Sequence, residues 1–249
     1  MKSAKKTQAF LFVVLVSIFS ACKTYYVAEE KPTLVSVQKI AADSSILHTY
    51  QPYKEILDGK MKVAIGELEN DLTKEKPEST LGNFCAHVIY NRAEKYLGVK
   101  PDFALVNYGG IRIPSLNKGV IKVEDIYKLM PFDNYVVIVT LDGATTKKLI
   151  DKLASEGGWP VEGISFKIKD NAPIDILIQQ QPFDSNRNYQ VAMIDYVANG
   201  GDKFEFLKGT PQKHSGVLFR DALLEYVKEE TVAGRKISVI KDGRVQNAQ

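Results

Sequence analysis

The chain has 249 residues, enough for one domain with a large core or two small domains, and its 45% apolar and 25% charged residues are typical of a globular protein. The formal net charge is +3, but three of the 33 bases (Lys2, Lys5 and Lys6) lie in an acid-free segment that we expect to be removed, which leaves a neutral chain. A nucleic-acid-binding protein would show a basic surplus gathered into a patch, so the composition argues against that class.

The first 22 residues have the pattern of a targeting segment. Basic "MKSAKK" precedes apolar "AFLFVVLVSIF", which is too short to span a bilayer, and small residues "SAC" follow. The ending on Cys22 is similar to a bacterial lipobox, with Phe19 where leucine is usual. We therefore predict a lipoprotein signal peptide over 1–22, lipid attachment at Cys22, and a location in the cell envelope at a membrane. A plain secretory peptide with an incidental cysteine is the alternative.

Residues 23–58 are predicted to be a tether and an N-terminal extension. The segment begins polar and unpatterned, as suits a link between lipid and fold. "TLVSVQKI" (33–40) then alternates like a strand. "ILHTYQPYKEIL" (46–57) has a helical pattern, although Pro52 counts against it.

Asp58-Gly59 predicts a turn before a strand over 61–69, and 71–79 is a charged loop. Ser79 or Thr80 can cap a helix over 81–98. Apolar residues recur on one face of that helix at Leu81, Phe84, Cys85, Val88 and Ile89. Cys85 is most simply a small buried residue, and with Cys22 lipidated no disulfide can form within the chain.

The remaining elements intermix strands and helices. Strands are predicted over 102–107, 134–141, 163–169, 174–179, 188–195 and 236–240, and helices over 123–130, 144–155 and 218–230. Because strict βαβ alternation is lacking, the fold class is α+β, with a mixed β-sheet and packed helices.

Two predicted strands end in a glycine pair with polar neighbours, in "LVNYGGIR" and "VAMIDYVANGGDKF". The residues concerned are Asn107, Gly109, Gly110 and Arg112 in the first segment, and Gly200, Gly201 and Asp202 in the second. Glycine permits positive φ and lets backbone approach a ligand closely. Arg112 offers a planar fork of donors for phosphate or carboxylate, and Asp202 offers acceptors for sugar hydroxyls. The alternative is two tight turns with a surface salt bridge.

A third segment, "LMPFDNYV", contributes an aromatic residue. Pro131 fixes φ ahead of Phe132, and Tyr196 lies close before the second glycine pair. Two aromatic faces about 7 Å apart would hold a flat ring between them, with about 1–3 kcal/mol from each stacking contact. The alternative is that both rings fill the core.

Four motifs in this order, "STLGNF", "NYGGIR", "MPFDN" and "DYVANGGD", resemble the C-terminal domain of the 5'-nucleotidases. These are periplasmic and surface enzymes that remove phosphate from nucleotides. The resemblance covers about residues 59–241, which leaves 242–249 as a tail.

In that family the C-terminal domain supplies substrate specificity. The resemblance implies that Phe132 and Tyr196 sandwich the nucleobase and that Asn107 hydrogen-bonds the base or its neighbourhood. It implies that Arg112 holds the ribose–phosphate side and that Asp202 takes the ribose hydroxyls. The four glycines belong to the same predicted substrate site, and Asn134 matches a family position in some members.

Two departures from the family pattern stand out. Tyr196 occupies a position where many members have phenylalanine, which preserves the ring and adds a hydroxyl. Members often carry one or two further arginines ahead of the capped helix, but here none precedes Arg92. Lys74 or Lys76 is the candidate substitute, although lysine lacks the bidentate fork.

The family's chemistry resides in a larger N-terminal metallophosphatase domain, where two metal ions activate a water. That domain needs Asp-x-His, Gly-Asn-His-Asp/Glu and His-x-His clusters. This sequence has His48, His87 and His214 far apart, and its Gly82-Asn83 pair is followed by phenylalanine. We therefore expect no catalytic residue, metal ligand or cofactor in this chain, and a divalent metal pair in a partner.

The leading hypothesis is the specificity half of a split 5'-nucleotidase. It would bind a nucleotide or nucleoside and present it to a separate metallophosphatase on the same membrane face, without hydrolysing a phosphoester alone. The first alternative is a stand-alone nucleoside-binding lipoprotein for uptake. The second is a degenerate scaffold that retains the fold without a ligand.

Overall fold

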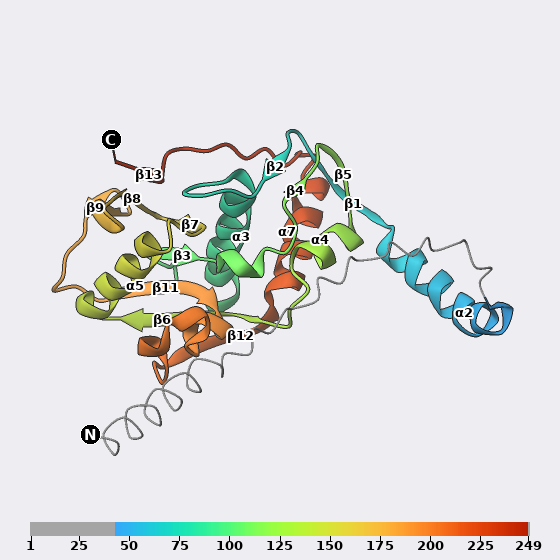
Figure 1. Cartoon of the computed structure of the whole chain (residues 1–249), viewed down its shortest axis with the longest axis horizontal. Coiled ribbons are helices and arrows are strands. Elements are labelled where there is room, and N and C mark those ends of the chain that lie inside the picture. Colours follow the sequence, from blue (N-terminus) through green and yellow to red (C-terminus); the bar gives the residue numbers. More distant parts are fainter. Residues whose placement is uncertain (1–42, 249) are drawn as a thin grey trace, which may run out of the picture. The chain divides into compact units, whose positions relative to one another are not determined.

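The computed structural model describes residues 43–248 of the chain (Figure 1). The chain divides into two compact units, 1–48 and 49–249, and the sheets lie in the second. The predicted signal peptide, Cys22, and the predicted strand at 33–40 fall outside the described residues.

The first described element is helix α2 (Ser44–Met61), which contains Pro52 and has no buried side chain. The predicted helix is confirmed, but the predicted turn at Asp58-Gly59 is wrong, because the helix continues through it. The Asp58 carboxylate accepts from Lys54 Nζ at 3.2 Å and from Lys62 Nζ at 2.8 Å, which supports the last helical turn. Over residues 43–248, no helix combines the length and apolar character needed to cross a membrane.

A five-stranded sheet forms the centre of the second unit, in the order β12-β6-β11-β3-β7. Its strands are β3 (Phe103–Leu105), β6 (Tyr135–Leu141), β7 (Val161–Glu162), β11 (Tyr189–Ile194) and β12 (Gln212–Leu218). β11 is parallel to β3 and the other neighbours are antiparallel, so the predicted mixed sheet is confirmed. Residues Val136 to Val139 are all buried, which means that both faces of β6 are covered.

Helix α3 (Thr80–Leu97) contacts every strand of this sheet and lies beside α7 (Phe219–Val232) (Figure 1). Its start is decided locally, because the Ser79 hydroxyl accepts from the Gly82 amide at 3.0 Å. Its end is equally local: Gly98 has a left-handed φ of 64°, and its amide donates to the Glu94 carbonyl. The other helices are α4 (Val123–Leu129), α5 (Gly143–Ser155) and α6 (Asp195–Ala198).

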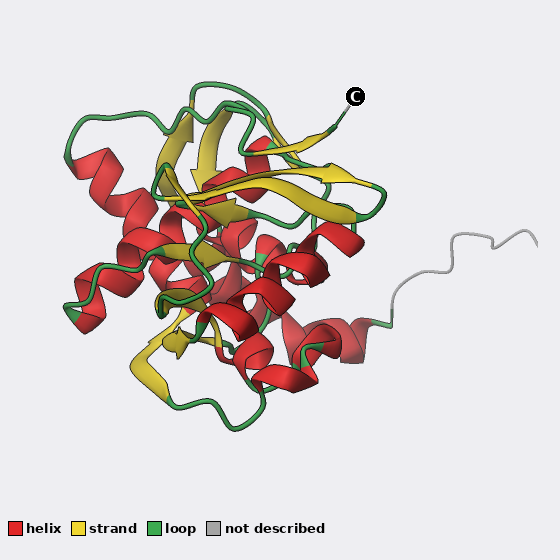
Figure 2. Cartoon of the chain, turned by 90° about the vertical axis from the view of Figure 1, so that its left-hand side faces the viewer, coloured by secondary structure: helices red, strands yellow, loops and turns green. Residues whose placement is uncertain are grey.

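A second sheet has the order β10-β9-β8-β13, and two short antiparallel pairs join β1 to β5 and β2 to β4. The strands are β1 (Ala64–Leu68), β2 (Leu72–Thr73), β4 (Ser115–Leu116), β5 (Gly119–Lys122), β8 (Ile164–Lys169), β9 (Ala172–Ile178), β10 (Gln181–Pro182) and β13 (Val245–Asn247). The predicted strand over 236–240 is wrong, since only Ile237 bridges to Leu68 there. The last described strand is instead β13, which pairs with β8. It is the strand that leads to the C-terminus marked in Figure 2.

The topology brings three predicted site segments to one edge of the central sheet. The parallel strands β3 and β11 end at this edge, and antiparallel β6 begins there. Asn107 follows β3, Tyr196 follows β11, and Phe132 precedes β6. Segments far apart in the sequence thus meet because of strand order.

Candidate functional site

Asn107 lies two residues after the end of β3, immediately ahead of the 3₁₀ turn η1 (Tyr108–Gly110), and is 5% exposed. Its Nδ2 donates to Asp202 Oδ2 at 2.9 Å, whereas its buried Oδ1 has no partner among the described residues. Neither Gly109 nor Gly110 has positive φ. Gly110 instead avoids a steric clash, because a Cβ at this position would lie 2.3 Å from Asn107 Oδ1.

Tyr196 and Asp202 are joined through the tyrosine hydroxyl. This hydroxyl donates to Asp202 Oδ1 at 3.1 Å and accepts from the Asp202 amide at 3.3 Å. A Cβ on Gly201 would lie 2.5 Å from the Tyr196 ring, so glycine lets the ring pack on the backbone. Gly200 is the member of this pair with positive φ, at 94°.

Asp202 therefore connects Asn107 and Tyr196 into a single hydrogen-bonded network, defined here as the Asn107–Asp202–Tyr196 network. Each carboxylate oxygen has one side-chain donor and retains further acceptor capacity, which would suit a hydroxyl-bearing ligand. Within residues 43–248, Asp202 and Arg112 form no salt bridge with each other.

Phe132 and Tyr196 are 39% and 44% exposed, so neither ring fills the core. No aromatic ring in the described part of the chain contacts either of them. The Arg112 guanidinium carbon lies 5.7 Å from the Phe132 ring centroid, and its Nη1 lies 3.4 Å from the Gly109 carbonyl oxygen. Arg112 thereby links the segment from Phe132 to Tyr135, called here the Phe132 segment, to the turn after Asn107.

Asn134 contributes a backbone contact. Its carbonyl oxygen accepts from the Phe219 amide at 2.8 Å, which joins the start of β6 to the start of α7. A ligand contact by the Asn134 side chain stays a prediction.

The two candidate lysines lie beside Tyr108 in the first glycine turn. Lys74 Nζ is 4.2 Å and Lys76 Nζ 4.7 Å from the centroid of the Tyr108 ring. Burial lowers the pKa of Lys74, and the positive charges of Arg112 and Lys76 lower it further. Lys74 Nζ also donates to the Ile111 carbonyl at 2.7 Å.

A pocket of about 270 Å³ lies between the two glycine turns. The residues that line it include Lys76, Tyr108, Gly109, Asp202 and Lys203. Lys74 is not among the residues that line it. Of the two lysines, Lys76 is therefore the better placed to reach a ligand that enters the pocket.

Residues 59–209 match the family described as "5'-nucleotidase, C-terminal domain". The chain belongs to this family. The resemblance carried by the four sequence motifs is thereby confirmed over that range.

Two curated relatives of this C-terminal domain are the proteins UshA of Yersinia enterocolitica and Escherichia coli K12. They are 27% identical to this chain over 204 and 207 residues, and each match covers 78% of this chain but 36% of the relative. The chain thus spans about a third of the length of these relatives. The crystal structure of a 5'-nucleotidase precursor from Thermus thermophilus has the same fold, with a TM-score of 0.67 at 24% identity over 83% of this chain and 43% of that chain.

Asp195 lies beside the candidate site of this 5'-nucleotidase C-terminal domain and was not among the residues that the sequence predicted. Its Oδ1 accepts from the Tyr135 amide at 3.0 Å and from the Tyr196 amide at 2.8 Å. One carboxylate thus ties the segment after Phe132 to Tyr196. The sequence feature that could have identified Asp195 is an acidic residue directly after a buried strand, in the first turn of a helix.

The described part of the domain, residues 43–248, contains no group of three or more His, Cys, Asp or Glu that could hold a metal ion. His87 is bonded to Asn91, with 2.9 Å between Nε2 and Nδ2, and the His214 ring lies 4.7 Å from that of Tyr135. Cys85 is fully buried, as predicted, and burial raises the pKa of its thiol to about 12. A thiol with that pKa is protonated at neutral pH and is a poor nucleophile.

Replacing Tyr196 by phenylalanine is expected to raise the Kd for adenosine about two- to tenfold, because a single hydrogen bond contributes about 0.5–1.5 kcal/mol. The substitution keeps the ring but removes the hydroxyl bonds to Asp202 that orient both groups before a ligand binds. Isothermal titration calorimetry with adenosine checks this result.

Tyr53→Phe is the matched control for that substitution, since Tyr53 is 74% exposed on α2. An unchanged adenosine affinity in Tyr196→Phe would show that the hydroxyl contributes nothing to ligand binding.

Proposed function

We propose that this chain binds a nucleotide or nucleoside at the edge of its central sheet and presents it to a separate metallophosphatase. The observation that carries the proposal is the Asn107–Asp202–Tyr196 network, in which the Asp202 carboxylate accepts from both other side chains. The Phe132 ring is half-exposed. Arg112 and Asp195 link the Phe132 segment to the two turns that contribute this network.

The chemistry of these groups suits the parts of a nucleotide. Two exposed aromatic rings offer stacking faces for a base, whatever its identity. The Asp202 carboxylate retains acceptor capacity for ribose hydroxyls. The Arg112 guanidinium, with no carboxylate partner among residues 43–248, is suited to the phosphate side.

The hydrolytic step in this proposal belongs to the partner. The sequence has none of the histidine motifs of the family's metallophosphatase domain. A divalent metal pair in the partner would activate the attacking water and stabilise the leaving oxygen. Lipid on Cys22 would hold the chain in the cell envelope, on the same membrane face as the partner.

Titration of the chain with adenosine and AMP, followed by tyrosine fluorescence, tests the binding step. We expect saturable binding of both ligands. No binding at millimolar concentration, with or without the partner, would end the proposal.

The partner is tested by a pull-down from native membranes, with a nucleotidase assay in added Mn²⁺ or Zn²⁺. We expect AMP hydrolysis by the recovered complex and none by the chain alone. If the chain binds adenosine but recovers a transporter and no phosphatase, the uptake function replaces the split nucleotidase.

A further inference from the structure

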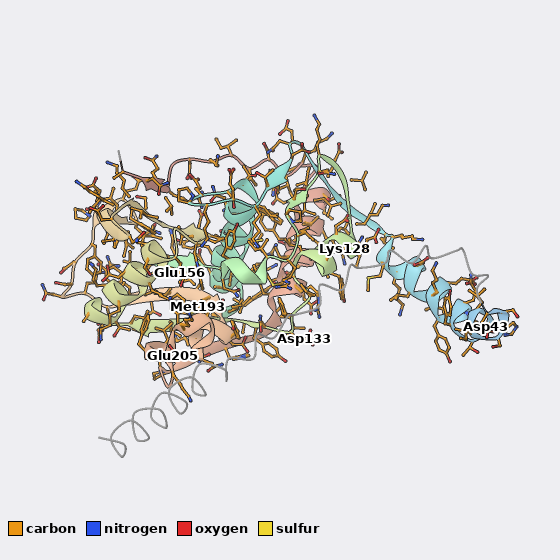
Figure 3. All side chains as sticks on the ribbon, in the orientation of Figure 1. Asp43, Lys128, Asp133, Glu156, Met193 and Glu205 are labelled. Carbon is orange, nitrogen blue, oxygen red and sulfur yellow. The ribbon has the colours of Figure 1, made fainter. Side chains whose placement is uncertain are left out.

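The segment from Phe132 to Tyr135 is held at each of its residues by contacts from elsewhere in the chain. The Asn134 carbonyl accepts from the Phe219 amide, and the Tyr135 amide donates to Asp195. The remaining two contacts come from one side chain, Arg220. Its Nη2 lies 2.7 Å from Asp133 Oδ1, and its Nη1 lies 3.5 Å from the Phe132 carbonyl oxygen. Asp133 is labelled in Figure 3.

Arg220 is well placed to act as a rigid support. Its side chain is 11% exposed, although its partner Asp133 is 76% exposed. The guanidinium carbon lies 4.6 Å from the centroid of the Tyr127 ring, so α4 also contacts this side chain. One planar fork thus joins α4, α7 and the Phe132 segment.

The position of Arg220 in α7 is unfavourable by itself. It is the second residue of the helix, where the helix dipole disfavours a positive charge. The contacts with Asp133, the Phe132 carbonyl and Tyr127 offset this cost. The arginine therefore has a local role in holding the segment before β6, beyond filling a surface position.

We propose that Arg220 is a positioning residue that presents the Phe132 ring for stacking against a ligand's base. The inference rests on the proposed function. Arg220 makes no ligand contact in this proposal. It acts by restricting the half-exposed loop before binding, which reduces the entropy lost when the ring is immobilised.

The test is AMP titration of Arg220→Met, which removes the fork but keeps an unbranched side chain against Tyr127. We expect the Kd for AMP to rise about three- to tenfold, the range that corresponds to ordering one side chain. Arg235→Met is the matched control, because Arg235 pairs with Glu230 at the other end of α7 and is 61% exposed. Its Kd should stay at the wild-type value.

A double-mutant cycle that combines Arg220→Met with Phe132→Leu separates an effect on the position of the Phe132 ring from a general loss of protein stability. In that background the stacking ring is gone, so Arg220→Met should cause no further rise in Kd. A rise of equal size in both backgrounds would overturn the proposal. If Arg220→Met fails to fold, Asp133→Asn decides, since an unchanged AMP affinity in this exposed-site variant also overturns it.

The two proposals fail differently. If the wild-type chain does not bind AMP, the proposed function fails and this inference fails with it. If the wild type binds AMP and Arg220→Met binds equally well, the positioning role alone is wrong.

Discussion

Replacing both Phe132 and Tyr196 by alanine is expected to raise the Kd for AMP at least about 30-fold. Each base–aromatic contact contributes about 1–3 kcal/mol, so loss of both removes about 2 kcal/mol or more. Because the two side chains are 39% and 44% exposed, the free energy of unfolding should change far less than it would for core aromatics. Calorimetric titration with AMP and thermal unfolding of the same samples measure the two effects.

The same measurements are made on the two single variants, and Tyr53→Ala is the matched control. Each single substitution should weaken binding by a smaller factor, and Tyr53→Ala on the exposed face of α2 should bind AMP as the wild type does. An unchanged Kd for AMP in the double variant would exclude base stacking by these rings. Absence of binding in the wild type and the double variant alike would support the degenerate scaffold.

Gly110→Ala is expected to lower the free energy of unfolding by about 1–3 kcal/mol, the usual range for overpacking. A Cβ at this position would lie 2.3 Å from Asn107 Oδ1 and 3.1 Å from its Cγ, so the amide must move. That movement breaks the bond from Asn107 Nδ2 to Asp202 and leaves Asp202 held only by Tyr196. We expect a rise of at least about tenfold in the Kd for AMP, since a hydrogen bond to a charged group contributes about 1.5–3 kcal/mol.

Gly109→Ala is the matched control for folding. A Cβ on Gly109 meets nothing within 4 Å, and its φ is not positive, so its stability should stay within about 0.5 kcal/mol of the wild type. Equal destabilisation by the two substitutions in a thermal melt would mean that the turn requires glycine for its backbone and not for the Asn107 side chain.

The helices and strands that were predicted best are those whose boundaries depend on contacts between residues a few positions apart in the sequence. The Ser79 cap and the Gly98 terminus bound α3 through contacts with residues three or four positions away. The β-branched run of β6 identifies a buried strand by composition alone. The motif order was also sufficient for the family, since residues 59–209 match the 5'-nucleotidase C-terminal domain.

Two predicted elements were wrong, the turn at Asp58-Gly59 and the strand over 236–240. In both cases the local sequence pattern carries no information about the contacts that the segment makes in the folded chain. Asp58-Gly59 is a common turn pair, but here it lies within α2, where Asp58 pairs with Lys54 and Lys62. The apolar alternation over 236–240 is typical of a strand, yet pairing there is limited to Ile237. A strand needs a neighbour with free backbone groups. One side of β8 pairs with β9, and the later segment β13 occupies the other side.

The sequence by itself determined the kinds of groups that could form a site: two aromatic residues, an amide, an arginine and a carboxylate near strand ends. Only the tertiary structure decided that Tyr196 bonds Asp202, that Gly110 accommodates Asn107, and that Asp195 and Arg220 hold the Phe132 segment. The physical reason is that Arg220 and Asp133 are 87 residues apart in sequence. Their contact depends on the order and direction of β3, β11, β6 and β12, which no local pattern of residues specifies.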